Sequence, residues 1–176
     1  MKRTVWALLI VAALSVPAAA QDVTPVTVDG SVGAPVNAVW DAWTTNEGLR
    51  SWLTPQADID LRVGGLIRTN YREQERLGDP GTIVYTILAV EPRRVLALQI
   101  TGPPSNFPFP TIVQKMSTVL YFLAVDDQVS RVRIVSGPFG ADEESQRMRA
   151  FFETGNAILM DQLQRHFLAK RQQSIR

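Results

Sequence analysis

The sequence contains no cysteine. This absence excludes disulfide bonds, thiolate chemistry and attachment of a lipid to a cysteine. It contains a single histidine, His166, whereas a metal site needs several clustered His, Cys or carboxylate ligands. The close carboxylates lie in turns, at a helix start or on the solvent side of a predicted strand. We therefore expect no metal and no cofactor.

Catalytic signatures are also lacking. The chain has no G-x-S-x-G elbow, no G-x-G-x-x-G fingerprint and no P-loop. A catalytic triad would have to use His166, the one side chain suited to acid–base work near neutral pH. No nucleophile can be assigned to it, so no catalytic residue is predicted.

No apolar run is long enough to span a bilayer. The longest, from Val5 to Val16, covers 12 positions, whereas a spanning helix needs about 20. This run follows Lys2 and Arg3 and precedes three alanines, which is the pattern of a secretory signal. The sequence therefore predicts cleavage between Ala20 and Gln21, and a periplasmic or secreted protein without a membrane span.

A strong charge of either sign is missing too. The chain has 18 basic and 17 acidic residues, and removal of Lys2 and Arg3 would leave 16 and 17, a net charge of −1. Nucleic-acid binding calls for a basic excess on one face, so we do not expect it. After a signal at residues 1–20, the chain is long enough for a single domain over 21–170, followed by a flexible tail at 171–176.

A long amphipathic helix is predicted over residues 142–170, with Asp142 as its N-cap. Its apolar stripe contains Met148, Phe152, Leu159, Leu163 and Phe167. Gly155 and His166 fall on the same stripe and are unusual core residues, since a glycine inside a helix costs about 1 kcal/mol relative to alanine.

Several other segments alternate apolar and polar residues, which is typical of β-strands. Short, turn-rich connections between the later strands predict an antiparallel meander. One sheet with one long helix must curl around that helix to bury both apolar faces, which defines an α+β fold. The expected order is a strand at 26–33, helices at 35–43 and 46–53, and strands at 57–63, 66–72, 82–90, 95–101, 114–125 and 129–136.

A proline-rich connection at 102–113 interrupts this order with four prolines and two phenylalanines, Phe107 and Phe109. Prolines lack N–H donors, so this segment should not join the sheet. The two phenylalanines can form a lid over ordinary core, a gate at the mouth of a cavity, or anchors for a protein partner.

Three motifs carry a family resemblance. They are Val39-Trp40 with Thr44 and Trp52, the turn Arg62-x-Gly64-Gly65, and Pro92-x-Arg94. The chain resembles the START-like (SRPBCC) superfamily, nearest to the branch named for the heat-shock-protein ATPase activator homologue. The resemblance implies a helix-grip fold, in which a curved antiparallel sheet of about seven strands grips the C-terminal helix, often around a hydrophobic cavity.

The resemblance implies no universal catalytic residue, and this chain departs from the family pattern twice. Gly155-Asn156 stands where relatives often have Gly-Trp, and the connection at 102–113 is longer than usual. Both departures are expected to alter the cavity and its mouth.

Cavity-lining residues are predicted from the helix stripe, from the resemblance and from the aromatic content. The resemblance places Val119, Tyr121 and Leu123 inward on one strand, and Val132, Ile134 and Ser136 inward on the next. The candidate ligand-binding residues are Trp52, Tyr71, Tyr85, Tyr121, Ile134, Ser136, Met148, Phe152, Gly155, Leu159 and His166, with Phe107 and Phe109 as candidate gate residues.

Two residues of the long helix have competing explanations. Gly155 either permits close approach of helix and sheet or leaves room for a ligand. His166 is either a core-edge histidine satisfied by a carbonyl or water, or a polar group that holds the head of a ligand.

The predicted function is binding of a hydrophobic or amphipathic small molecule, including a lipid, between the sheet and the C-terminal helix. Two alternatives stay open. One is an enzyme such as a cyclase or hydrolase that uses His166 or Tyr121 with cavity water on a bulky apolar substrate. The other is a protein-interaction module anchored by Phe107 and Phe109.

Overall fold

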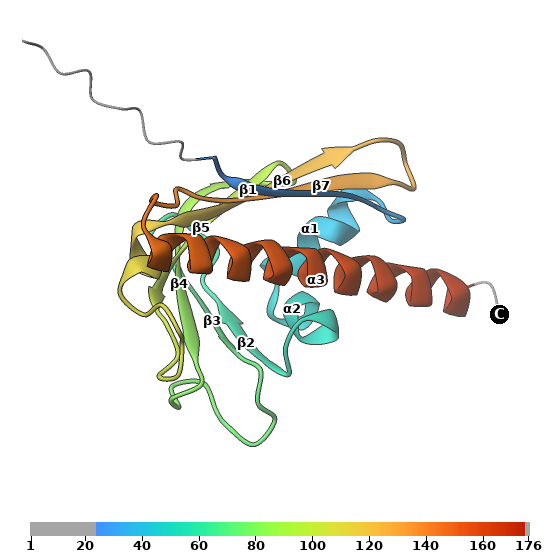
Figure 1. The fold of residues 1–176 in the computed structure, drawn as a ribbon. Coiled ribbons are helices and arrows are strands. Elements are labelled where there is room, and N and C mark those ends of the chain that lie inside the picture. Colours follow the sequence, from blue (N-terminus) through green and yellow to red (C-terminus); the bar gives the residue numbers. More distant parts are fainter. Residues whose placement is uncertain (1–23, 175–176) are drawn as a thin grey trace, which may run out of the picture.

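The computed structural model describes residues 24–174 (Figure 1). The predicted signal segment at residues 1–20 and its cleavage site lie outside the described residues. The described chain forms seven strands, three α-helices and one short 3-10 helix, η1. In chain order these are β1 (Val26–Val32), α1 (Val36–Thr44), α2 (Asn46–Trp52), β2 (Gln56–Ile59), β3 (Leu66–Asn70), β4 (Ile83–Glu91), β5 (Val95–Gly102), η1 (Ile112–Lys115), β6 (Ser117–Ala124), β7 (Ser130–Gly137) and α3 (Glu143–Ser174).

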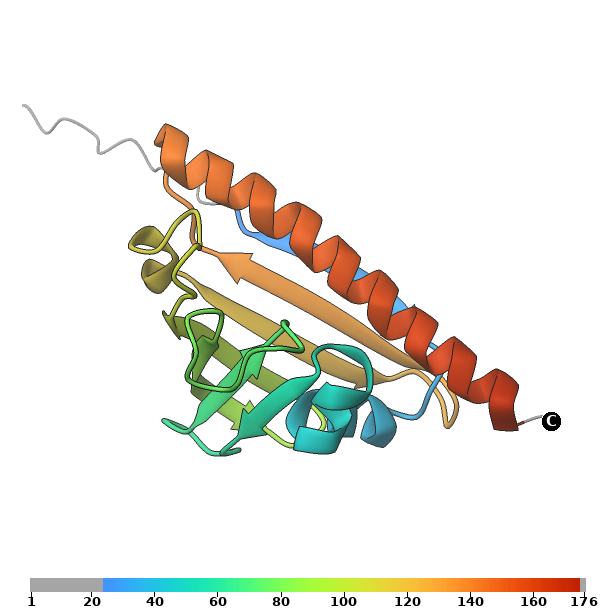
Figure 2. The ribbon, with the colours of Figure 1, turned by 90° about the horizontal axis from the view of Figure 1, so that it is seen from below.

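The strands form one antiparallel sheet in the order β1-β7-β6-β5-β4-β3-β2. Strands β2 to β7 are a meander, as predicted, and β1 pairs with β7. Figures 1 and 2 show the sheet bending around α3, with α1 and α2 beside the helix. Irregular pairing of β4 with β5, at Val84/Tyr85 and Ile87/Ala89, contributes to this bend because bulges increase local twist. The predicted α+β helix-grip architecture is confirmed.

The turn between β2 and β3 contains the motif Arg62-x-Gly64-Gly65. The alternation of apolar and polar residues predicted a strand through Val63, but β2 ends at Ile59. Leu61 and Val63 are 39% and 62% exposed. Gly64 has φ +77°, and a Cβ on Gly65 would collide with a carbonyl of the same turn. The Gly64 N–H donates to the Ile87 carbonyl of β4 at 2.8 Å. The two glycines therefore allow the turn to close tightly against β4.

Helix α3 begins and ends for different reasons. Asp142 caps its start, because the Ser145 N–H donates to Asp142 Oδ1 at 2.9 Å. The predicted end at Lys170 is too early, since the helix continues to Ser174. Residues 171–174 contain no glycine or proline to stop the helix, so most of the predicted flexible tail is helical.

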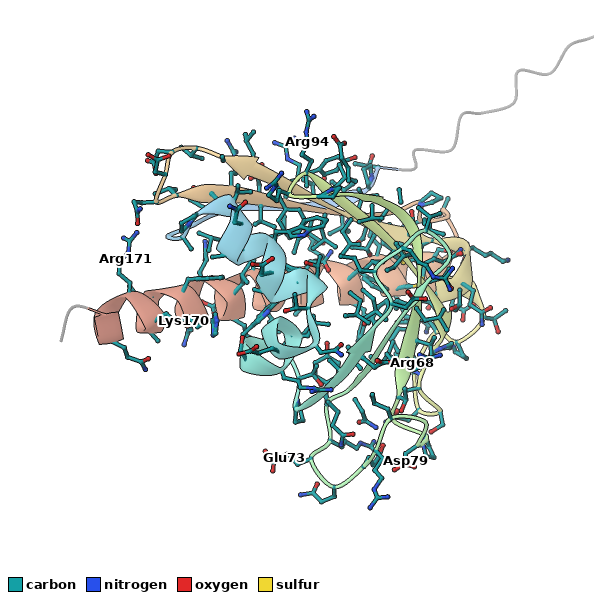
Figure 3. All side chains as sticks on the ribbon, turned by 180° about the vertical axis from the view of Figure 1, so that it is seen from behind. Arg68, Glu73, Asp79, Arg94, Lys170 and Arg171 are labelled. Carbon is teal, nitrogen blue, oxygen red and sulfur yellow. The ribbon has the colours of Figure 1, made fainter. Side chains whose placement is uncertain are left out.

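The last turns of α3 extend beyond the curved part of the sheet. Figure 3 shows Lys170 and Arg171 there, whereas Arg94 projects from the outer side of the sheet, away from the helix. The Arg171 guanidinium donates to the Gln128 carbonyl at 3.4 Å, which joins this end of α3 to the β6–β7 turn. Within residues 24–174, no helix has the length and hydrophobicity needed to cross a bilayer.

Strand β6 faces the opposite way from the prediction. Val119, Tyr121 and Leu123 were expected to point inward, but Tyr121 and Leu123 are 45% and 61% exposed. Leu120 and Phe122 are buried instead, at 1% and 4% exposure. Tyr121 therefore lies on the outer face of the sheet and is not a wall residue.

Pairing with β7 decides this orientation. Leu120 pairs with Ile134, and Tyr121 pairs with Arg133. Residues directly opposite each other in an antiparallel pair share a face of the sheet. Ile134 is fully buried, as predicted, whereas Arg133 lies outside, where it forms an ion pair with Asp29 at 2.7 Å. The inward position of Ile134 therefore requires Leu120 to be inward as well.

Two hydrophobic clusters fill the space between sheet and helix. The larger joins α1, α2 and the sheet to the C-terminal half of α3, through residues such as Trp40, Leu163 and Phe167. The smaller joins the N-terminal part of α3 to the proline-rich connection, through residues such as Met148 and Phe109.

Candidate functional site

A cavity of about 120 Å³ lies where the two clusters meet. The sheet, α1, α2, η1 and α3 supply its walls. The lining residues are Trp43, Leu49, Leu53, Ile67, Thr69, Tyr71, Tyr85, Leu98, Ile100, Val113, Met116, Thr118, Leu120, Ile134, Phe152, Asn156 and Leu159.

The wall of the cavity is mostly apolar. Among the described residues, no Asp, Glu, Lys, Arg or His lines it. Its polar groups are hydroxyls, one amide and one indole N–H, all of them neutral. An apolar pocket with a few placed polar groups is typical of small-molecule sites.

Two polar atoms on wall residues have no hydrogen-bond partner. They are Trp43 Nε1 and Thr69 Oγ1, and no other buried side-chain polar atom between residues 24 and 174 is unpaired. The two residues are only 5% and 2% exposed. The Thr69 hydroxyl does contact the Tyr85 phenol, and this interaction lowers the pKa of Tyr85 against the larger effect of burial. Leaving a buried polar group unpaired costs about 1–3 kcal/mol, and this cost applies to the Trp43 indole N–H.

Tyr71 and Tyr85 supply the two phenols of the wall. Tyr71 is 48% exposed as a whole residue, but desolvation of its phenol by burial raises the pKa to about 12. Burial also raises the pKa of Tyr85, and the neighbouring Tyr71 adds to this. Both phenols therefore stay protonated and neutral at physiological pH.

Asn156 connects α3 to the sheet at the cavity wall. It is 6% exposed and donates from Nδ2 to Ser136 Oγ at 2.9 Å. Ser136 Oγ is also 2.9 Å from Thr118 Oγ1, so one chain of hydrogen bonds joins α3, β7 and β6. Asn156 was not among the predicted ligand-binding residues. The sequence did offer one indication of its role, because Asn156 follows Gly155 at a position where relatives in the resembled family often have Trp.

Five predicted residues meet at the cavity, namely Tyr71, Tyr85, Ile134, Phe152 and Leu159. They come from three strands or strand ends and from α3, and lie far apart in the sequence. The structure thus brings together about half of the predicted set.

Three others lie behind the wall. Trp52 packs edge-on against Trp43 with ring centroids 4.9 Å apart, and its Nε1 donates to the Ala42 carbonyl. Ser136 supports the wall through its hydrogen bonds to lining residues. Met148 is 2% exposed within the smaller hydrophobic cluster.

Gly155 does not face the sheet. A Cβ at this position would meet nothing within 4 Å, so neither close helix packing nor room for a ligand explains the glycine. The prediction that it faces the core is wrong by one residue, because a step of one residue turns the helix by about 100° and Asn156 is the buried neighbour.

His166 lies on the inner side of α3 but outside the cavity lining. Its Nε2 is 3.5 Å from the Ser51 hydroxyl of α2, and its ring packs edge-on against Phe167. Burial, with the positive charge of Lys170, lowers the pKa of His166. This is the position of a half-buried histidine at the edge of the core.

Phe107 and Phe109 pack on α3. Their ring centroids are 5.5 and 5.9 Å from that of Phe151, and Phe109 is only 8% exposed. Neither residue lines the cavity, but Val113 and Met116, which follow in the same connection, do. Val113 of η1 and Met116 directly after it therefore line the cavity, while the two phenylalanines of the proline-rich segment cover core.

The fold and this cavity define a helix-grip protein with an internal apolar site. The model of the family "Activator of Hsp90 ATPase homolog 1-like protein" matches residues 33–167. The chain belongs to this family. No curated protein sequence matches the chain.

Solved structures share the fold at low sequence identity. A protein from Nitrosomonas europaea is 18% identical with a TM-score of 0.64, over 85% of this chain and 97% of that chain. The Aha1 dimer from Colwellia psychrerythraea is 17% identical with a TM-score of 0.58, over 80% and 96%. A norcoclaurine synthase point mutant from Thalictrum flavum, in complex with a transition-state analogue, is 12% identical with a TM-score of 0.56, over 84% and 96%.

Proposed function

We propose that this protein binds a hydrophobic small molecule non-covalently in the cavity between the sheet and α3. The observation that carries the proposal is an apolar cavity at the meeting point of two core clusters, with uncharged polar groups on its wall. Packed cores have few voids larger than a water molecule. A void of this size is best explained by an occupant.

The size of the cavity limits the ligand. An apolar cavity of roughly 150 Å³ is enough for benzene, whereas drug-sized ligands occupy roughly 300–1,000 Å³. The 120 Å³ present here fits one ring or a short alkyl segment. A complete lipid would need η1 or α3 to move outward.

Three of the four residues named for the two alternative functions do not fit them. His166 and Tyr121 do not line the cavity, so a reaction there cannot use them. Phe109 is buried against Phe151 and is not available as an anchor for a partner. The enzyme from Thalictrum flavum shares only the fold at 12% identity, which carries no activity over to this chain.

The site of action is proposed to be the periplasm or the exterior, on the strength of the signal pattern at residues 1–20. An exported protein does not meet a cytosolic chaperone, so we do not extend the chaperone role in the family's name to this chain. The intact mass of protein expressed with its first 20 residues tests export. A mature chain that begins at Gln21 supports it, and an uncleaved chain contradicts it.

Native mass spectrometry tests binding directly. Purified protein is expected to carry a small adduct that is lost on activation, and α-methylstyrene, a one-ring apolar probe, is expected to raise the unfolding temperature. Asn156→Trp, which places a ring on the cavity wall, is expected to abolish both effects. Absence of any adduct together with no probe effect on the wild type would contradict the proposal.

A further inference from the structure

We propose that the outward face of α3 is an interface between two copies of this chain, whose α3 helices pack antiparallel about a two-fold axis at Thr154. This inference is independent of the proposed function, because the residues of the outward face do not line the cavity.

The outward face consists of exposed residues at helical spacing. Its members are Glu143, Arg147, Ala150, Phe151, Thr154, Ala157, Ile158, Asp161 and Arg165. Figures 1 and 2 show α3 at the margin of the fold, and no other helix or strand of residues 24–174 lies over its outward side. Phe151 and Ile158, near the middle of the face, are 45% and 53% exposed. An uncharged stretch with large exposed apolar side chains, bounded by charged residues at both ends, is typical of a protein contact.

The uncharged middle of this face is complementary to itself. When two helices pack antiparallel about Thr154, residues equally far before and after it lie opposite each other. Phe151 then lies opposite Ala157 of the second copy, and Ile158 lies opposite Ala150 of the second copy. Large side chains therefore meet small ones, which is what close packing of two helices requires.

The charges at the two ends of the face follow the same symmetry. Arg147 lies opposite Asp161 of the second copy, and Glu143 lies opposite Arg165 of the second copy. Within one chain these residues already form ion pairs, Arg147 with Glu143 at 3.6 Å and Arg165 with Asp161 at 2.8 Å. The dimer joins each of these pairs to the opposite pair of the second copy. A parallel arrangement would instead place each charge beside the same charge, which is unfavourable.

The length of the face sets the strength of the contact. From Glu143 to Arg165 it spans about 33 Å at 1.5 Å per residue, and a shallow crossing angle of about 20° keeps both charged ends within reach of the second copy. One helix face makes a small interface. We therefore expect a reversible dimer that dissociates on dilution and weakens as salt screens its exposed ion pairs.

Sedimentation velocity over a wide range of protein concentration measures this association. The wild-type protein is expected to change from monomer to dimer as its concentration rises. Ile158→Glu places a charge in the uncharged middle of the face and is expected to abolish the dimer. Leu123→Glu is the matched control, because Leu123 is 61% exposed on the outer face of the sheet. It is expected to dimerise as the wild type does.

Two charge reversals test which residues meet. In a dimer of Arg147→Glu chains, two carboxylates would lie opposite each other, and in a dimer of Asp161→Arg chains, two guanidinium groups would. Each variant alone is expected to associate roughly tenfold more weakly than wild type. A mixture of the two variants restores opposite charges at both ends, so it is expected to form a heterodimer of about wild-type strength. Native mass spectrometry resolves this heterodimer when one variant is labelled with nitrogen-15.

The mixture also separates the contact from any effect on folding, since each variant is the same chain alone and in the mixture. A wild-type protein that stays monomeric at every concentration would overturn the inference. So would a dimer that survives Ile158→Glu, because the interface would then lie elsewhere. If the mixture associates no better than the separate variants, antiparallel pairing about Thr154 is wrong.

Discussion

Replacement of Asn156 by Trp tests both the cavity and the orientation of α3. Asn156 lines the cavity and is 6% exposed, so an indole at this position would enter the space that a ligand is proposed to occupy. Voids in cores cost about 24 cal/mol per Å³, so complete filling of 120 Å³ is worth about 3 kcal/mol.

Part of that gain is lost with the amide. The hydrogen bond from Asn156 to Ser136 contributes about 1 kcal/mol, while Ser136 keeps its partner Thr118. The net expectation is a stabilisation of about 2 kcal/mol, or a rise of about 4–8 °C in the unfolding temperature for a domain of this size. Binding of α-methylstyrene is expected to disappear.

Urea unfolding, thermal unfolding and calorimetric titration with α-methylstyrene measure the two effects. Gly155→Ala is the matched control, since its added Cβ meets nothing within 4 Å. It is expected to stabilise the helix by about 1 kcal/mol and to leave probe affinity unchanged. The reasoning is refuted if the Asn156→Trp protein is destabilised and still binds α-methylstyrene with wild-type affinity. Position 156 would then not face an open cavity.

Three further predictions concern the histidine, the phenylalanines and the tyrosines. Because the pKa of His166 lies below its ordinary 6.5, the unfolded chain takes up a proton first as pH falls, and stability is lost below about pH 6.5. His166→Gln should flatten urea-measured stability between pH 7 and 5, and an unchanged slope would contradict this. Phe109→Ala should lower the free energy of unfolding by about 3–5 kcal/mol. Phe107→Ala should lower it less, because Phe107 is only partly buried. If both variants lower the melting temperature equally, the packing described here is wrong. Because the pKa of Tyr71 is raised from 10.0 to about 12, the unfolded chain loses its phenol proton first, so stability should fall between pH 10 and 12. Tyr71→Phe should lessen that fall in alkaline unfolding experiments, and no change would count against a buried hydroxyl.

Residues with clear local patterns were predicted correctly. In β7, Arg131 and Arg133 alternate with Val132 and Ile134, so charge and hydrophobicity together assign the faces. In β6 the run LYFL is apolar at every position, and local pattern cannot choose between its two faces. Pairing with β7 made the choice. The predicted strand at 57–63 is present as β2 but ends at Ile59. It was predicted too long because apolar and polar residues continue to alternate into the turn that contains Gly64.

In the candidate site too, residues with a clear local pattern were predicted and a residue that depends on a distant partner was missed. Tyr71, Tyr85, Phe152 and Leu159 were predicted because large apolar or aromatic residues on inward faces are the material of a cavity wall. Asn156 was missed because a polar residue on a helix reads as exposed until its partner, Ser136, is brought to it from another strand.

The sequence by itself determined the element order, the α+β class, the family and the absence of thiol chemistry, because each depends on local periodicity, turn residues or composition. Only the tertiary structure decided which side of β6 faces inward, that Gly155 faces solvent while Asn156 faces the cavity, and that the Trp43 indole N–H is left unpaired. These facts depend on how side chains from distant segments fill or fail to fill one space, and no single segment contains that information.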